Sequence, residues 1–116
     1  MRKFIFIASV FIAAALMFSA NAVFAASGAS LFNSEGCIAC HVIDGKGGTV
    51  GPNLSHVGAT RSLSWIKTQI VNPNAHFAPG TMVTINGKSF MAVMPDHKNM
   101  PVSQLNTLAD YLASLK

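Results

Sequence analysis

The feature that most constrains this chain is a five-residue segment, Cys37-Ile38-Ala39-Cys40-His41. It holds the only two cysteines of the sequence, three positions apart, and a histidine follows the second one directly. Two thiols and an imidazole held this close by the backbone can all act on one bound group. The rest of the chain must then fold around that group.

Three chemistries use paired cysteines at this spacing. A redox disulfide usually lies in a thioredoxin-like alternation of strands and helices, which the glycine-rich and proline-rich sequence after Cys40 does not suggest. A zinc site needs further ligands, and the spacings of His56, His76 and His97 match no zinc motif. The third chemistry is covalent haem, in which both cysteines form thioethers and the next histidine binds iron. The motif therefore favours haem at Cys37, Cys40 and His41, with a structural disulfide as the alternative.

The N-terminus reads as a secretory signal peptide. Arg2 and Lys3 precede an apolar run over residues 4–18, and Val23-Phe24-Ala25 has the form of a leader-peptidase site. The apolar run is shorter than the roughly 20 residues that span a bilayer, which disfavours a retained anchor. We expect a signal peptide over 1–25 and one domain over 26–116. Bacteria attach haem outside the cytoplasm, so we expect the mature protein in the periplasm, with no membrane span.

Charge gives no sign of a nucleic-acid partner. Beyond residue 25 the chain has six Lys and Arg and four Asp and Glu, a net charge of +2, with no basic cluster. A domain of 91 residues buries a modest core, and domains of this size often depend on a covalent staple or cofactor.

Residues from about 28 to 115 resemble class I monohaem cytochromes c of the small bacterial periplasmic type. Gly28 and Phe32 stand at the family's usual offsets before the first cysteine, and Gly51–Leu54 resembles its Gly-Pro-x-Leu. The resemblance implies one covalent haem c, with the Pro52 carbonyl accepting a hydrogen bond from Nδ1 of His41. Such a bond would fix the orientation of the imidazole.

The resemblance also implies an all-α fold, with about three to four helices around the haem and a short β-hairpin before the second iron ligand. The first and last helices should cross, with Gly28 and Phe32 meeting Tyr111 and Leu112. The apolar spacing of Leu105, Leu108, Ala109, Leu112 and Leu115 predicts a C-terminal helix that starts near Pro101.

A methionine is expected as the second iron ligand. In the family, Met-Pro lies 17 positions before the tyrosine of a terminal Tyr-Leu, and Tyr111 follows Met94 by 17. This implies Met94, with Met100 packing at the start of the last helix. The remaining alternatives are Met100, Met82 and His97, the last of which otherwise packs at the pocket rim. Met91 is expected in the core, where thioethers fill gaps well.

Two further segments frame this ligand. Residues 81–93 predict a β-hairpin, because Asn86-Gly87 favours a two-residue turn, and the second arm leads to Met94. Residues 58–73 predict a short helix that Asn72-Pro73 ends, with Leu63, Ile66 and Ile70 on one face.

Arg61 and Trp65 are four apart and should share one side of that helix's first turn. The resemblance implies that they contact a haem propionate. His56 and His76 are expected as loop histidines near the surface, and residues 44–53 as a flexible loop around the porphyrin.

The expected function is one-electron transfer in a respiratory chain, with no catalytic residues and no enzyme activity. Donor and acceptor proteins should dock transiently at an exposed haem edge of a monomer. Two other functions stay open: a haem c subunit of a larger oxidoreductase or oxidase complex, and a haem-based redox or gas sensor. A thiol–disulfide protein without haem is the least favoured.

Overall fold

The computed structural model describes residues 28–116, so the predicted signal peptide over 1–25 lies outside the described residues. Residues 28–34 are helical. They are followed by the 3-10 turn η1 (Cys37–Ala39), helices α2 (Val57–Thr60) and α3 (Leu63–Val71), the 3-10 turn η2 (Pro73–Ala75) and helix α4 (Val102–Ala113). Two antiparallel hairpins pair β1 (Val42–Ile43) with β2 (Lys46–Gly47), and β3 (Met82–Ile85) with β4 (Lys88–Met91). Within 28–116 no helix has the length and apolar character needed to cross a bilayer.

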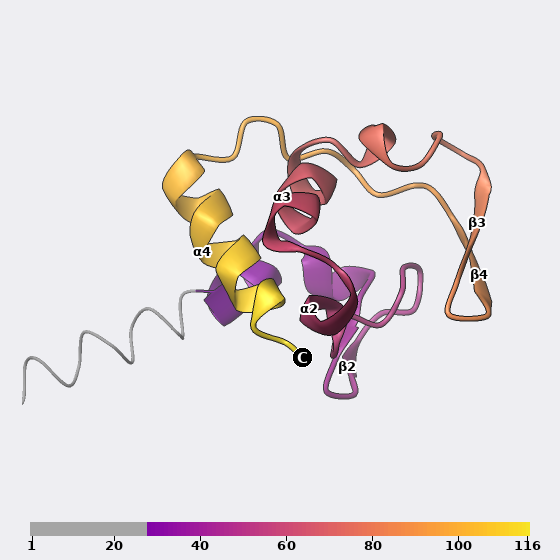
Figure 1. The fold of residues 1–116 in the computed structure, drawn as a ribbon, viewed down its shortest axis with the longest axis horizontal. Coiled ribbons are helices and arrows are strands. Elements are labelled where there is room, and N and C mark those ends of the chain that lie inside the picture. Colours follow the sequence, from indigo (N-terminus) through magenta and orange to yellow (C-terminus); the bar gives the residue numbers. More distant parts are fainter. Residues whose placement is uncertain (1–27) are drawn as a thin grey trace, which may run out of the picture.

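The described chain is mostly helical, as predicted, and its core lies where the helices meet (Figure 1). Helix 28–34 crosses α4, and the Gly28 backbone lies against the Tyr111 side chain. This confirms the predicted contact between the two ends of the domain. The buried cluster combines three helical segments and consists of Phe32, Ile66, Ile70, Leu108, Ala109 and Leu112.

Helix α4 follows the predicted periodicity. It begins at Val102, with Pro101 as the residue before it, and its buried face carries Leu108, Ala109 and Leu112. Leu108 is fully buried. Leu115 lies beyond the last helical residue and packs against the core from the C-terminal tail.

Helix α3 begins at Leu63, two residues after Arg61, so Arg61 lies outside its first turn. Ser62 caps it, because its Oγ accepts a hydrogen bond from the Trp65 backbone N–H at 3.1 Å. Arg61 is therefore extended backbone before the helix, and the prediction that it shares the first turn with Trp65 is wrong. Ile66 and Ile70 are buried as expected, but Leu63, as the first helical residue, is 38% exposed.

The predicted hairpin over 81–93 is confirmed. Val83 pairs with Phe90 and Ile85 with Lys88, and Asn86 and Gly87 both have positive φ, as a two-residue turn of this type requires. Alternation along β4 turns Phe90 inward and its neighbour Met91 outward. Met91 is 53% exposed, so its expected place in the core is wrong.

The small hairpin β1–β2 was not expected. It occupies the start of the segment predicted as a flexible loop, residues 44–53. Asp44 and Gly45 both have positive φ and form its turn, and Val42 pairs with Gly47. The Asp-Gly pair is a turn signal of the same kind as Asn86-Gly87, but it stands between strands of only two residues.

Replacing Gly28 with Ala should destabilise the domain. A Cβ there would meet Cβ of Tyr111, would lie 2.9 Å from its Cγ, and would lie 3.2 Å from the Thr107 carbonyl oxygen. Helix propensity alone would give a gain of about 0.5–1 kcal/mol, whereas overpacking costs about 1–3 kcal/mol. We expect a lower urea midpoint for Gly28→Ala than for the wild type, and little change for the exposed control Ser30→Ala. A raised midpoint for Gly28→Ala would contradict the close crossing.

Candidate functional site

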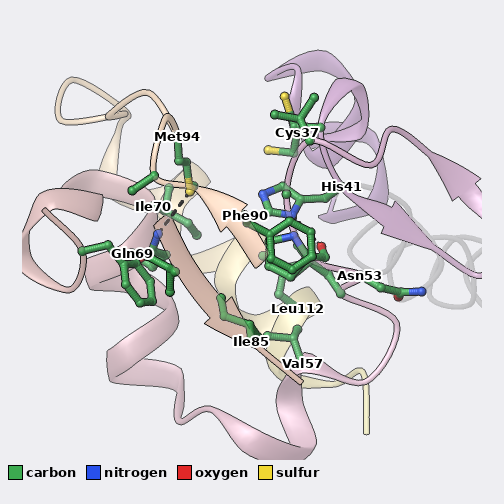
Figure 2. A pocket seen from close by; sticks show the side chains of 18 of the residues that line it. Cys37, His41, Asn53, Val57, Gln69, Ile70, Ile85, Phe90, Met94 and Leu112 are labelled. Carbon is green, nitrogen blue, oxygen red and sulfur yellow. Dashed lines mark hydrogen bonds between the residues drawn. The ribbon is translucent and has the colours of Figure 1, made fainter. Parts of the chain in front are cut away.

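One cavity of ≈ 370 Å³ lies between the β3–β4 hairpin, α3, the end of α4 and the segment after the cysteine motif. Its walls are largely apolar (Figure 2), and they include Leu54, Val57, Ile70, Val83, Ile85, Phe90 and Leu112. The seven residues predicted for the site come from five separate stretches of sequence. All of them line this cavity: Cys37, Cys40, His41, Pro52, Arg61, Trp65 and Met94.

The two cysteines stand on the short 3-10 turn η1 and are not joined in a disulfide. Gly36 precedes the turn with a φ of 79°, and the His41 backbone N–H donates to the Cys37 carbonyl at 3.0 Å. This turn places both thiols and the histidine on one wall. Burial raises the pKa of the Cys37 thiol, and the nearby Glu35 carboxylate adds to the effect. The Cys37 thiol is therefore protonated at neutral pH.

The His41 imidazole is held by the Pro52 carbonyl oxygen, which lies 2.8 Å from Nδ1. A carbonyl only accepts, so Nδ1 carries the proton. Burial lowers the pKa of His41, and the bond to Pro52 opposes that shift by a smaller amount. The ring is thus neutral at neutral pH, with the lone pair on Nε2, the form in which histidine binds a metal.

The His41 ring packs directly on the Gly51 backbone. A Cβ at residue 51 would lie 2.5 Å from Cε1, 2.9 Å from Nδ1 and 3.1 Å from Nε2 of that ring. Any larger side chain at this position would push the imidazole away from the Pro52 carbonyl. The Gly-Pro pair therefore sets both the orientation of the ring and the space that it occupies.

Met94 lies across the cavity from His41, with its sulfur on the side of α3 (Figure 2). Its Sδ accepts a hydrogen bond from Nε2 of Gln69 at 3.3 Å. Met100 lies elsewhere, half-buried against the helical core, and Met82 is 62% exposed on the outer face of the hairpin. Of the described methionines, Met91 and Met94 line the cavity, and Met91 is the exposed one of that pair.

Arg61 and Trp65 meet although they do not share a helical turn. The Arg61 Cζ lies 4.2 Å from the centre of the Trp65 ring, a cation–π contact. His76 also stacks on Trp65, with ring centres 4.3 Å apart and planes 4° from parallel. His76 lies in the turn after η2, as predicted, and this stack leaves it half-buried.

The other two histidines have separate environments. His56 is exposed, as expected, and its Nδ1 pairs with the Lys116 carbonyl oxygen at 2.8 Å. His97 lines the cavity, with Nε2 3.4 Å from the Glu35 carbonyl oxygen and a buried Nδ1 that has no partner among the described residues.

Gln69 was missed by sequence reasoning, and so was the role of His76. A polar residue on an amphipathic helix is ordinarily solvent-facing, and no motif marks either position. Gln69 contacts Met94, which is 25 positions away, and His76 contacts Gln69 across seven positions. Both contacts arise only when α3, η2 and the Met94 segment come together.

Replacing Gly51 with Ala should disturb His41. The added methyl group cannot fit beside the ring, and overpacking of this kind costs about 1–3 kcal/mol. We expect a lower urea midpoint for Gly51→Ala and a changed environment for the His41 ring in NMR spectra. Thr49→Ala, an exposed position in the same segment, should match the wild type. An unchanged His41 signal in Gly51→Ala would contradict the described packing.

The chain was compared with known proteins at three levels. A model of the cytochrome c family matches residues 25–116. Neither the search of curated proteins nor the search of solved structures gave a match to this chain. The family match covers all of the described residues and confirms the resemblance predicted from the sequence. The chain therefore belongs to the cytochrome c family, and this membership implies a covalent haem c that serves electron transfer.

Proposed function

We propose that this protein is a periplasmic one-electron carrier whose single haem c is bound by two thioethers, at Cys37 and Cys40, and by His41 and Met94 as axial ligands. When bound, haem c supplies a one-electron Fe(III)/Fe(II) couple. With both axial positions filled by side chains, the iron has no position for a substrate, which favours electron transfer over catalysis. In this proposal residues 1–25 are the cleaved signal peptide and residues 26–116 the cytochrome domain.

The single observation that supports this proposal best is the pairing of His41 and Met94 across one apolar cavity. His41 presents a neutral imidazole, oriented by Pro52, from the wall that carries both thiols. Met94 presents a thioether from the α3 side. An imidazole and a thioether are the axial pair of cytochromes c with raised reduction potentials.

The described residues also fit the haem group itself. Cys37 and Cys40 are available as thiols, and Gly51 leaves room for the His41 ring. The apolar walls suit a porphyrin and keep water from it, which affects the reduction potential. The order of these residues along the chain agrees with the family's pattern.

Arg61 is proposed to bind a haem propionate, with Trp65 as its support. The guanidinium rests on the Trp65 ring at 4.2 Å and lines the cavity. A guanidinium can hold a carboxylate through two parallel hydrogen bonds, and the indole N–H of Trp65 can donate another.

Partner proteins are proposed to dock where the cavity reaches the surface. Val50, Met91 and Val93 line the cavity, and each is more than half exposed, at 54%, 53% and 52%. A small apolar rim of this kind suits a transient contact between a monomer and its electron donor or acceptor.

The first test is the visible spectrum of the purified protein, oxidised and then reduced. We expect a low-spin c-type spectrum, with the weak far-red band of methionine bound to ferric iron. A haem spectrum without that band would favour bis-histidine ligation or an open iron position, and with it a sensor rather than a carrier.

Replacing Met94 with Leu should remove one axial ligand while keeping side-chain volume. We expect loss of the far-red band, a lower reduction potential and binding of carbon monoxide to the reduced protein. Met100→Leu is the matched control and should keep all three properties of the wild type, because Met100 packs against the helical core. Retention of the band in Met94→Leu, or its loss in Met100→Leu, would contradict the ligand assignment.

Replacing Cys40 with Ser should leave at most one thioether. We expect a reduced yield of holoprotein. In the holoprotein that does form, the absorption band of the denatured and reduced haem should be shifted, because one vinyl group stays unsaturated. Ser30→Ala, an exposed position away from the motif, should give the normal yield. A wild-type yield with an unshifted band in Cys40→Ser would exclude a second thioether at this residue.

A further inference from the structure

We infer that Gln69 and His76 act as positioning residues for Met94: Gln69 donates a hydrogen bond to the thioether sulfur, and His76 fixes the Gln69 amide in the orientation that this bond requires. The inference rests on the proposed function, in which Met94 binds the iron.

Three side chains form a continuous hydrogen-bonded series that leads from the cavity wall, at Met94 and Gln69, to His76 behind it. Gln69 Nε2 lies 3.3 Å from Met94 Sδ, as Figure 2 shows with a dashed line. His76 Nδ1 lies 2.8 Å from Gln69 Oε1. All three side chains are half-buried, where a misplaced polar atom is costly and a satisfied one is held firmly.

The chemistry of these groups allows one arrangement of protons. A thioether sulfur has no hydrogen to donate and accepts weakly, so the NH₂ group of Gln69 must face it. The amide oxygen then faces His76, and an oxygen there can only accept. His76 must therefore carry a proton on Nδ1. The flipped amide would place an oxygen lone pair against the sulfur lone pairs and lose the first bond.

His76 is itself held in place by aromatic contacts. Its ring stacks on Trp65 at 4.3 Å and meets the Phe77 ring edge-on at 6.2 Å. Its backbone N–H donates to the Pro73 carbonyl at 3.1 Å, at the end of η2. The ring therefore offers Nδ1 to Gln69 from a fixed direction, rather than as a freely rotating side chain.

The backbone beyond Met94 is tied to the same helix. The His97 N–H donates to the Ile70 carbonyl oxygen at 3.0 Å. Two successive residues of α3 thus hold the Met94 segment, Gln69 through the sulfur and Ile70 through the main chain. The side-chain bond is the one that selects where the sulfur lies.

A hydrogen bond to the sulfur has an electronic effect as well as a geometric one. The sulfur has two lone pairs, and the bond from Gln69 engages one of them and leaves the other for iron. The hydrogen bond from the Gln69 N–H withdraws electron density from the sulfur and so weakens its donation to iron. Ferric iron depends on this donation more than ferrous iron does, so the ferric state loses more stability. Hydrogen bonding to an axial ligand is one of the means by which proteins set a haem potential. Gln69 therefore raises the reduction potential.

The test uses the holoprotein with Gln69→Leu, His76→Phe and the double variant. We expect Gln69→Leu to lower the reduction potential and to shift the far-red band of the ferric protein. His76→Phe keeps an aromatic ring for Trp65 but removes the bond to Gln69, so it should shift both readouts in the same direction by less. The double variant should match Gln69→Leu alone, because His76 acts through Gln69. Gln104→Leu, an exposed position on α4, is the matched control and should leave both readouts unchanged.

A Gln69→Leu protein with the wild-type potential and band would overturn the inference. Shifts that add in the double variant would overturn the role of His76 through Gln69. The ¹⁵N shifts of the His76 ring in the reduced wild-type protein give an independent check: a neutral ring protonated on Nε2 rather than Nδ1 would overturn the proton assignment. Met94→Leu distinguishes a failure of the proposed function from a failure of this inference. If Met94→Leu keeps the far-red band, Met94 is not the iron ligand and the proposed function itself fails.

Discussion

The hydrogen bond between His41 and Pro52 is the constraint around which the site is arranged. It joins residues 11 positions apart and fixes both the tautomer and the direction of the imidazole. The intervening chain is held by main-chain bonds, from the Gly51 N–H to the Cys40 carbonyl at 2.7 Å and from the Leu54 N–H to the Val42 carbonyl at 2.8 Å. The cysteine turn, β1–β2 and the Gly-Pro segment therefore form one unit, and the position of each side chain in it depends on the others.

The opposite wall is built in a different way. There the Met94 segment has no regular secondary structure of its own and takes its position from α3. The β3–β4 hairpin brings the chain back toward α3, and its inward-facing Ile85 and Phe90 contribute to the apolar lining (Figure 2). Val83 of the same hairpin also lines the cavity. One wall is thus ordered by local contacts, and the other by contacts between segments that are distant in sequence.

This difference explains what could be predicted from the sequence. Local signals were sufficient for the cysteine motif, for the Asn86-Gly87 turn and for the buried face of α4 with Leu108 and Leu112. They failed where a single residue decides the geometry: Ser62 caps α3 and leaves Arg61 outside it, and alternation along β4 exposes Met91. Gln69 and His76 could not be found from the sequence, because nothing local distinguishes a glutamine that faces a cavity from one that faces water.

The β3–β4 hairpin has a consequence for how the cavity can open. None of its residues belongs to the buried cluster of the described chain or to the partly buried side chains packed against that cluster. In Figure 1 the hairpin stands apart from α4, on the far side of the molecule. Segments with few core contacts open at a lower free energy than the core does. The hairpin can therefore move away from α3 while the helical core stays folded, which gives a large planar group a route into the cavity.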